Sequence, residues 1–297
     1  MANAYFFAFV LAVIGSGVVD VEPRAAQAIP RAPTDVKIVR ASPGCSIPAP
    51  RIGDFHLSVR DGRGIARDYE VIVPSGYTPA RTWPIAFVYH GAGQNEAIAK
   101  SYGLQDAAGA ADSSLFVFPQ GMNYSTYGVG WDDSATGYDI IFFDNMLASL
   151  TEGYCIDVGR VFVAGFSWGC DQATALICAR GDRLRAVSAA SCTDEFRNAS
   201  DYRTYQSCPV QNSAAIRFTH DSSGGDSGYP IPLFSTTSAL YRLFNSCSNS
   251  STPTSPSPCV AYASCTKPVV ECSYANLGHA LPANWAAETW AFFASFK

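Results

Sequence analysis

Short apolar runs alternate with longer helical stretches along most of the chain. Tyr69–Val73 alternates like a half-buried strand, whereas Ile85–Tyr89 is continuously apolar, as in a strand buried on both faces. Further runs predict the strands Leu115–Phe118, Val161–Ala164, Ala186–Ala190, Ile216–Thr219 and Pro268–Cys272. Ile140–Leu150 and Cys170–Ala179 have the length of helices and an apolar stripe. This alternation predicts an α/β fold in which helices cover both faces of a mostly parallel sheet.

The first 28 residues have the pattern of a targeting segment. Ala4–Val19 is almost wholly apolar but shorter than the roughly 20 residues of a membrane-spanning helix. Small residues follow and end in Ala26-Gln27-Ala28, which predicts a secretory signal peptide over 1–28 with cleavage after Ala28. Cleavage near Gly17 is the second choice, and an uncleaved anchor is a further alternative.

One main domain is expected after this segment. Residues 29–64 begin Pro-rich and are expected to run extended and pack on a domain that spans 65–297. Ser246–Pro258 is rich in serine and proline, as a linker between domains would be. Only 39 residues (259–297) follow it, too few for a separate core, so we interpret 246–258 as a surface insertion.

The composition narrows the class of protein. With 48% hydrophobic and 15% charged residues, the chain is not expected to be disordered. Its 20 Lys and Arg against 25 Asp and Glu give a net charge of -5 without a basic stripe, which argues against nucleic acid as a partner. We expect no membrane partner, and we expect a monomer.

The ten cysteines all lie beyond the expected signal peptide. An even number in such a chain predicts disulfide bonds and an extracellular or periplasmic location. The last four lie close together and are expected to pair locally: Cys247, Cys259, Cys265 and Cys272. No two cysteines have C-x-x-C spacing, so a zinc site is not expected.

Gly165-Phe166-Ser167-Trp168-Gly169 carries the strongest chemical signal. It follows a predicted strand directly and opens a predicted helix, which is the context of the nucleophile elbow in α/β-hydrolases. A Cβ at either glycine would collide with the neighbouring strand or helix, and the turn lifts the Ser167 hydroxyl above the sheet. The alternative is a glycine-rich turn with an incidental serine.

A nucleophilic serine needs a base, and in this fold the chain order is serine, acid, histidine. Only His220 and His279 follow Ser167. His279 lies in a loop between the last predicted strand and a C-terminal helix, where the base is expected. His220 ends a strand and precedes the acid candidates, so it breaks the order.

The acid is expected in the loop after the strand Ile216–Thr219, which offers Asp221 and Asp226. Asp221 lies nearer the strand end, and the residues by themselves leave both open. Asp171 belongs to the elbow helix and is expected to point away from the site.

An acyl-transfer site also needs amide donors for the oxyanion. The N–H of Trp168, directly after Ser167, is one expected donor. The other is expected in the glycine-rich loop after Ile85–Tyr89, where we prefer Ala92 and keep Gly91 and Gly93 as alternatives. His90 is expected to shape this loop rather than to act as a catalyst.

Several motifs together resemble one known group, the secreted α/β-hydrolase esterases that include feruloyl esterases, acetylxylan esterases and polyhydroxybutyrate depolymerases. The resemblance covers about 65–296. The matching segments are Arg67-Asp68-Tyr69, Val73–Tyr77, His90–Asn95, Pro119-Gln120-Gly121, Gly130-Trp131-Asp132, Tyr154–Asp157, Arg160–Val163, the elbow and Gly278-His279.

The resemblance favours Asp226 as the acid. The group usually has H-G-x-x-D-x-x-V-P around this residue, and here His220 and Asp226-Ser227-Gly228-Tyr229-Pro230 bracket that motif with two extra residues. Trp168 departs from the small residues common at its position, and its indole is expected to flatten the acyl pocket or to face an aromatic acyl group. Trp131, Tyr229 and Trp285 are further candidates for lining the pocket.

The resemblance implies a serine carboxylesterase that hydrolyses plant cell-wall esters, feruloyl esters first, with no metal or organic cofactor. Ser167 would attack the ester, His279 would take the proton, and Asp226 would orient the imidazole. Acetylxylan esterase and polyester depolymerase are alternatives in the same class. A peptidase and an inactive hydrolase fold that only binds its ligand are alternatives outside it.

Overall fold

The computed structural model describes residues 41–48, 51–124, 128–192, 213–254 and 258–297. By its contacts the chain divides into two units, Met1–Ile38 and Val39–Lys297. The expected signal peptide falls in the first unit and lies outside the described residues. Within the described ranges, no helix has both the length and the apolar character that crossing a bilayer requires.

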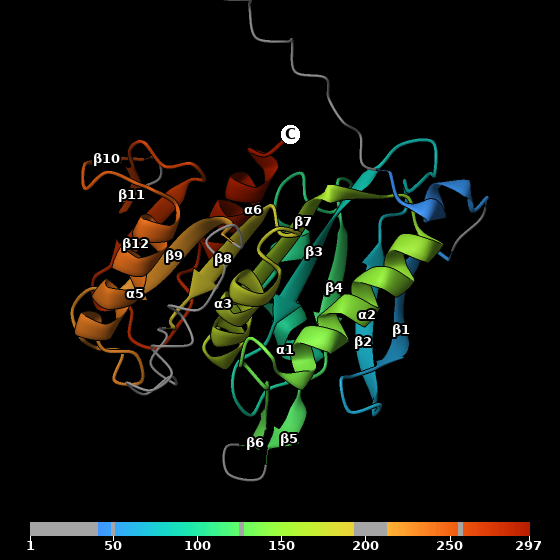
Figure 1. Cartoon of the computed structure of the whole chain (residues 1–297), viewed down its shortest axis with the longest axis horizontal. Helices are drawn as coiled ribbons and strands as arrows, with labels where there is room; N and C mark the ends of the chain where they lie inside the picture. Colours follow the sequence, from blue (N-terminus) through green and yellow to red (C-terminus); the bar gives the residue numbers. More distant parts are fainter. Residues whose placement is uncertain (1–40, 49–50, 125–127, 193–212, 255–257) are drawn as a thin grey trace, which may run out of the picture. The chain divides into compact units, whose positions relative to one another are not determined.

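A ten-stranded sheet forms the centre of the second unit, in the order β1-β2-β4-β3-β7-β8-β9-β12-β11-β10 (Figure 1). Its strands are β1 (Gly53–Arg60), β2 (Ala66–Val73), β3 (Trp83–Tyr89), β4 (Leu115–Pro119), β7 (Ile156–Phe166), β8 (Ala186–Ala190), β9 (Ala215–Asp221), β10 (Ser251–Pro253), β11 (Cys259–Tyr262) and β12 (Val269–Tyr274). Strands β4 to β12 in this order pair in parallel, and the two outer strands on each side pair antiparallel. A separate hairpin pairs β5 (Met122–Tyr124) with β6 (Gly128–Gly130).

Helices cover both faces of this sheet because its central strands are apolar on both sides. In β3, Ile85 and Phe87 enter one core cluster, whereas Ala86 and Val88 enter the other. The first cluster packs under α2 (Tyr138–Gly153), α3 (Trp168–Arg180) and α5 (Ile231–Phe244), and the second under α1 (Glu96–Ser101) and α6 (Trp285–Ala294) (Figure 1). The predicted α/β architecture is therefore confirmed.

All seven strands and both helices predicted from the apolar pattern are present, most of them longer than predicted. The pattern missed edge strands. Gly53–Arg60, in the segment expected to run extended, pairs with β2 along its whole length. Ser251–Pro253, in the Ser/Pro-rich stretch, pairs with β11 as the last strand of the sheet. Both edges expose much of their side-chain surface, so neither has a continuous apolar run.

Disulfide bonds fasten the chain at the edges and at one central point. Cys247 pairs with Cys265 and Cys259 with Cys272, which confirms the local pairing predicted for the last four cysteines. Two long-range bonds are Cys45–Cys155 and Cys170–Cys192. Cys178 is disulfide-bonded as well, and Cys208 lies outside the described residues. The Cys170–Cys192 bond ties the first turn of α3 to the end of β8, directly below the elbow.

Candidate active site

Ser167 lies in a strained turn between β7 and α3. Its φ of 56° and ψ of -130° fall where residues with a side chain are rarely found. The turn is tight because a Cβ on Gly165 would collide with the backbone of Gly169, and a Cβ on Gly169 with the carbonyl of Tyr89. Both glycines are therefore required, and the strand–turn–helix geometry of the elbow is present.

His279 meets Ser167 from a loop between β12 and α6. The imidazole Nε2 lies 2.9 Å from Ser167 Oγ, although 112 residues separate the two along the chain. The rings of Phe166 and Tyr229 lie beside the imidazole, with centroids 4.9 and 5.5 Å away. The side chain is 40% exposed, so a substrate can reach the proton-accepting nitrogen.

Asp226 faces the other side of the imidazole. Its Oδ2 lies 3.0 Å from His279 Nδ1, and its Oδ1 accepts the backbone N–H groups of Gly228 and Tyr229 at 3.2 Å. The carboxylate is buried. A buried carboxylate against Nδ1 favours the tautomer with the proton on Nδ1, which leaves Nε2 free to accept a proton from Ser167.

Asp221, the second candidate for the acid, does not contact the imidazole in the structure. Its carboxylate accepts the N–H groups of Ser223, Gly225 and Gly278 and the hydroxyl of Ser223. The hydrogen bond from the Gly278 amide, which is the largest cause, lowers the pKa of Asp221 below its ordinary range. Asp221 thus joins the loop that carries Asp226 to the loop that carries His279.

Two of the three amides considered for the oxyanion are already hydrogen-bonded within the loop. The N–H of Gly91 donates to Gln94 Oε1 at 2.9 Å and to the Tyr102 hydroxyl at 3.3 Å. The N–H of Gly93 donates to the carbonyl of Val129 at 2.7 Å. These hydrogen bonds hold the loop in place, and they occupy both N–H groups, so neither is expected to donate to the oxyanion.

The Ala92 N–H has no acceptor among the residues that the structure describes. It lies directly after Gly91, on which a Cβ would come within 3.1 Å of Ser167 Cβ. Trp168 is the first residue of α3, and the first amides of a helix point out of its hydrogen-bond ladder. Ala92 and Trp168 thus remain the two residues whose amides are expected to serve as oxyanion donors.

His90 supports this loop from below. Its Nδ1 donates to the carbonyl of Gly91 at 2.8 Å, and its Nε2 accepts the N–H of Gly121 at 2.9 Å. The ring is fully buried, and this burial lowers the pKa of His90 from 6.5 to about 4. His90 thus holds two loops together as a neutral ring.

The indole of Trp168, the residue after Ser167, packs against the β5–β6 hairpin. It packs closely against Gly130 of β6, where a Cβ would collide with the ring. The Tyr124 ring of β5 lies 5.9 Å away between centroids. Trp168 is half-buried, unlike the fully buried Trp131 and Trp285.

Two residues expected to line the pocket are placed elsewhere. Trp131 and Trp285 are each only 1% exposed, so the expectation that they contact substrate is wrong. Trp131 packs on Tyr89, and its indole N–H donates to the carbonyl of His90 at 2.8 Å. Trp285 packs in the core against Tyr102. The two residues belong to the two core clusters on opposite faces of the sheet.

The expectation that Asp171 points away from the site is also wrong. Asp171 is buried in the first turn of α3, and its Oδ2 accepts the Tyr229 hydroxyl at 2.8 Å. The same tyrosine lies beside His279. Sequence reasoning overlooked two signals: a tyrosine at a motif position that usually has valine, and an acid four residues after Ser167 in the elbow helix.

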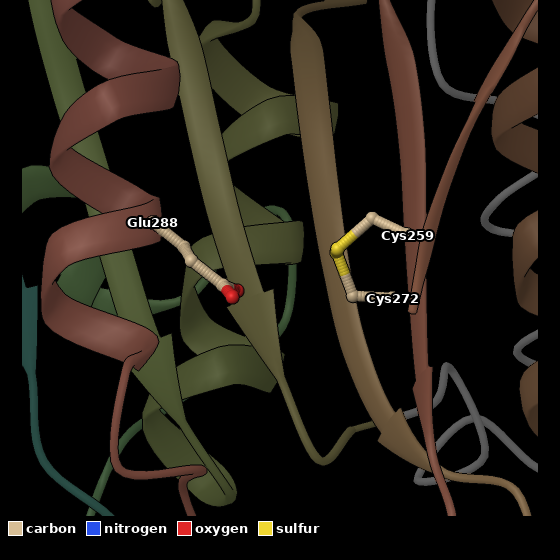
Figure 2. A group of neighbouring side chains, drawn as sticks. All are labelled: Cys259, Cys272 and Glu288. Atoms are coloured by element: carbon tan, nitrogen blue, oxygen red, sulfur yellow. A yellow bond between two sulfur atoms is a disulfide. The ribbon is translucent and has the colours of Figure 1, made fainter. Parts of the chain in front are cut away.

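Cys259, Cys272 and Glu288 come close enough to suggest a metal-binding group (Figure 2). The two cysteines form a disulfide, so neither offers the thiolate that a metal would need. Glu288 is paired with Arg217 and accepts the Tyr274 hydroxyl at 2.8 Å. The chemistry of these groups does not fit a metal site.

Comparison with known proteins relates the chain to esterases. No protein-family model matches it. It is 35% identical to feruloyl esterase C of Emericella nidulans over 132 residues, which are 42% of this chain and 46% of that protein. It is 30% identical to feruloyl esterase D of Neurospora crassa over 162 residues, which are 50% of this chain and 53% of that protein. The chain spans about half the length of these curated relatives.

The solved structure of acetyl xylan esterase from Aspergillus awamori superimposes on the chain with a TM-score of 0.61. The match covers 80% of this chain and 99% of that one at 15% sequence identity. At this identity the likeness concerns the fold alone. The chain has the α/β-hydrolase fold, and over about half its length it is related in sequence to feruloyl esterases.

We expect His90 to make the native protein less stable as the pH falls. Between pH 6.5 and about 4 the unfolded state binds a proton at His90 and the native state does not, so the free energy of unfolding falls with pH. The shift corresponds to about 3 kcal/mol. Urea unfolding from pH 7 to 4 should show a shallower pH dependence in His90→Gln than in the wild type.

His56→Gln, which removes an exposed imidazole from β1, is the control and should keep the wild-type slope. Equal slopes for His90→Gln and the wild type would contradict the assignment of a neutral, buried His90.

Proposed function

We propose that this chain is a secreted, monomeric serine carboxylesterase that hydrolyses feruloyl esters of plant cell-wall polysaccharides. The observation that carries the proposal is the line of contacts from Asp226 through His279 to Ser167. Curated feruloyl esterases are its relatives over about half their length, which supports the choice of ester and acyl group. The disulfide bonds support an oxidising, extracellular compartment.

Acylation begins when Ser167 Oγ attacks the ester carbonyl carbon. As the new C–O bond forms, the hydroxyl proton moves to His279 Nε2, and Asp226 stabilises the imidazolium through Nδ1. The carbonyl oxygen becomes negative and is met by the amides of Ala92 and Trp168. When the ester C–O bond breaks, the leaving alkoxide takes the proton from Nε2, and the acyl group stays on Ser167.

Deacylation repeats these steps with water. His279 Nε2 takes a proton from a water molecule, whose oxygen attacks the acyl carbon. The tetrahedral intermediate again places its negative oxygen at the amides of Ala92 and Trp168. The bond to Ser167 Oγ breaks, the oxygen regains the proton from His279, and the carboxylic acid leaves. Every proton is therefore accounted for by one imidazole, without a metal or an organic cofactor.

The choice of a feruloyl group rests on the indole of Trp168. Of the two aromatic residues next to Ser167 in sequence, Phe166 is buried and Trp168 is half-buried, and Gly130 and Tyr124 lie against the ring of Trp168. A fixed aromatic face beside the reacting carbon favours a flat aromatic acyl group, because offset stacking adds about 0.5–1.5 kcal/mol beyond buried area. An acetyl group would gain little from this surface.

A substrate panel tests the proposal. We expect the wild type to hydrolyse methyl ferulate with a higher kcat/KM than p-nitrophenyl acetate relative to their uncatalysed rates, and Ser167→Ala to lose this activity. Acetylated xylan, polyhydroxybutyrate film and a peptide amide complete the panel. Faster turnover of the film or of acetylated xylan would replace the feruloyl assignment, and hydrolysis unaffected by Ser167→Ala would support a fold that only binds its ligand.

The acid is tested by a matched pair of substitutions in one loop. Asp226→Asn should lower kcat by about 10²- to 10⁴-fold because the imidazole loses its charged partner and its preferred tautomer. Asp221→Asn should leave most of kcat but lower the melting temperature, because Asp221 holds the loops of Asp226 and His279 together. The reverse pattern, a greater kcat loss in Asp221→Asn, would assign the acid to Asp221.

Trp168 is tested by its effect on substrate preference. Trp168→Ala should lower kcat/KM for methyl ferulate by about tenfold, the worth of one aromatic contact, and should affect p-nitrophenyl acetate less. Trp168→Phe keeps an aromatic face and should retain most of the preference. If Trp168→Ala instead improves methyl ferulate hydrolysis, the indole restricts the pocket rather than binding the acyl group.

A further inference from the structure

We propose that Tyr229, anchored by the buried carboxylate of Asp171, is a positioning residue that fixes His279 and Ser167 relative to each other. The inference rests on the proposed serine esterase function and deepens it. It replaces the expectation that Tyr229 lines the substrate pocket. The residue is only 8% exposed, and its backbone N–H and its hydroxyl each donate to a carboxylate, Asp226 and Asp171 respectively.

Tyr229 touches the acid and the base at once. Its backbone N–H donates to Asp226 Oδ1 at 3.2 Å. Its ring lies nearly parallel to the imidazole of His279, with an interplanar angle of 22° and centroids 5.5 Å apart. The residue therefore restrains the rotation of the imidazole about the bond that points Nε2 at Ser167.

The hydroxyl of Tyr229 contacts the turn of α3 that follows the nucleophile. Burial raises the pKa of Tyr229, and so does the charge of Asp171, while a hydrogen bond with Ser167 opposes the rise. The phenol therefore stays protonated and donates its single proton to Asp171 Oδ2. Asp171 in turn donates its backbone N–H to the carbonyl of Ser167 at 3.2 Å, so the phenol is connected to the nucleophile through the first turn of α3.

Asp171 gives this hydroxyl its fixed direction. The carboxylate lies in the first turn of α3, where the helix dipole favours a negative charge, and it is 4% exposed. The Cys170–Cys192 disulfide holds the same turn. A valine at position 229 would pack against the imidazole but would offer no donor to Asp171, so the buried carboxylate would lose this hydrogen bond. Tyr229 and Asp171 therefore act as one unit.

The test separates positioning from substrate binding. We compare Tyr229→Phe, Asp171→Asn and the double variant with wild type on p-nitrophenyl acetate and methyl ferulate. A positioning role predicts that each single substitution lowers kcat about tenfold, by the same factor for both esters, with KM within about twofold. The double variant should lose no more than the stronger single one, because the two residues act together.

A matched control is Tyr262→Phe, which removes a tyrosine hydroxyl that donates to Glu271 at 3.1 Å on the far strands of the sheet. Its kcat should equal that of the wild type. Thermal unfolding of every variant identifies losses caused by unfolding. Should Asp171→Asn fail to fold, Tyr229→Phe together with Tyr229→Leu still decides the question, because the ring and the hydroxyl are then removed in turn.

The second readout is independent of the natural substrate. Phosphorylation of Ser167 by diethyl p-nitrophenyl phosphate, followed by released p-nitrophenolate, should slow by the same factor as kcat in Tyr229→Phe. A change confined to KM, or to methyl ferulate alone, would overturn the positioning role and make Tyr229 part of the acyl pocket. Additive losses in the double variant would overturn its coupling to Asp171.

The two proposals fail in different ways. A wild type that is phosphorylated at Ser167 but inert toward methyl ferulate contradicts the feruloyl assignment, while the phosphorylation rates of the variants still decide the role of Tyr229. A wild type that neither hydrolyses esters nor reacts with the phosphate triester overturns both proposals.

Discussion

The site depends on how closely α3 approaches strands β7 and β3. Gly165 and Gly169 have no side chains, and any Cβ there would meet backbone atoms of the facing segment. This approach forces Ser167 to a φ of 56° and places it as the residue before the helix. The strain is maintained by the buried sheet on one side and by the Cys170–Cys192 bond on the other. A looser turn would lower the hydroxyl toward the sheet and away from His279.

Two carboxylates in one loop divide the work of holding the imidazole. Asp226 contacts the ring, whereas Asp221 binds backbone amides on both loops and sets the distance between them. Asp221 does not touch the ring, yet the contact between Asp226 and the ring depends on Asp221. Among the described residues, the loop of His279 is hydrogen-bonded to the loop of Asp226 only through Asp221, the Ser223 hydroxyl and the Asp226–His279 contact itself. Burying several N–H donors against one carboxylate makes this junction rigid.

The sequence predicted the centre of the fold better than its edges. Strands buried on both faces, such as Ile85–Tyr89, appear as continuous apolar runs, and all of them were found. All three residues of edge strand β10 are exposed, so its pattern of polar and apolar residues does not differ from that of a surface loop. The order of chemical residues along the chain also identified Ser167 and His279, since an α/β-hydrolase fold fixes where the carboxyl ends of its strands meet. The residues by themselves left Asp221 and Asp226 open, because five positions separate them and either has the right chemistry; the family resemblance favoured Asp226, and in the structure Asp226 is the one that contacts His279.

The aromatic residues show why the rest of the site could not be predicted. Trp131, Trp168 and Trp285 carry the same indole, and sequence reasoning placed all of them around the substrate. Packing separates them: Trp131 and Trp285 are buried in the two core clusters, whereas Trp168, next to Ser167 in sequence, is half-buried. Whether an aromatic side chain is buried or exposed depends on which residues pack against it, such as Gly130 against the Trp168 ring. The same reasoning applies to Tyr229, whose place in the motif gives no hint of the buried Asp171 that orients its hydroxyl. In each case a partner that is distant in sequence decides the role of the side chain. A local sequence pattern does not show which distant residue that partner is.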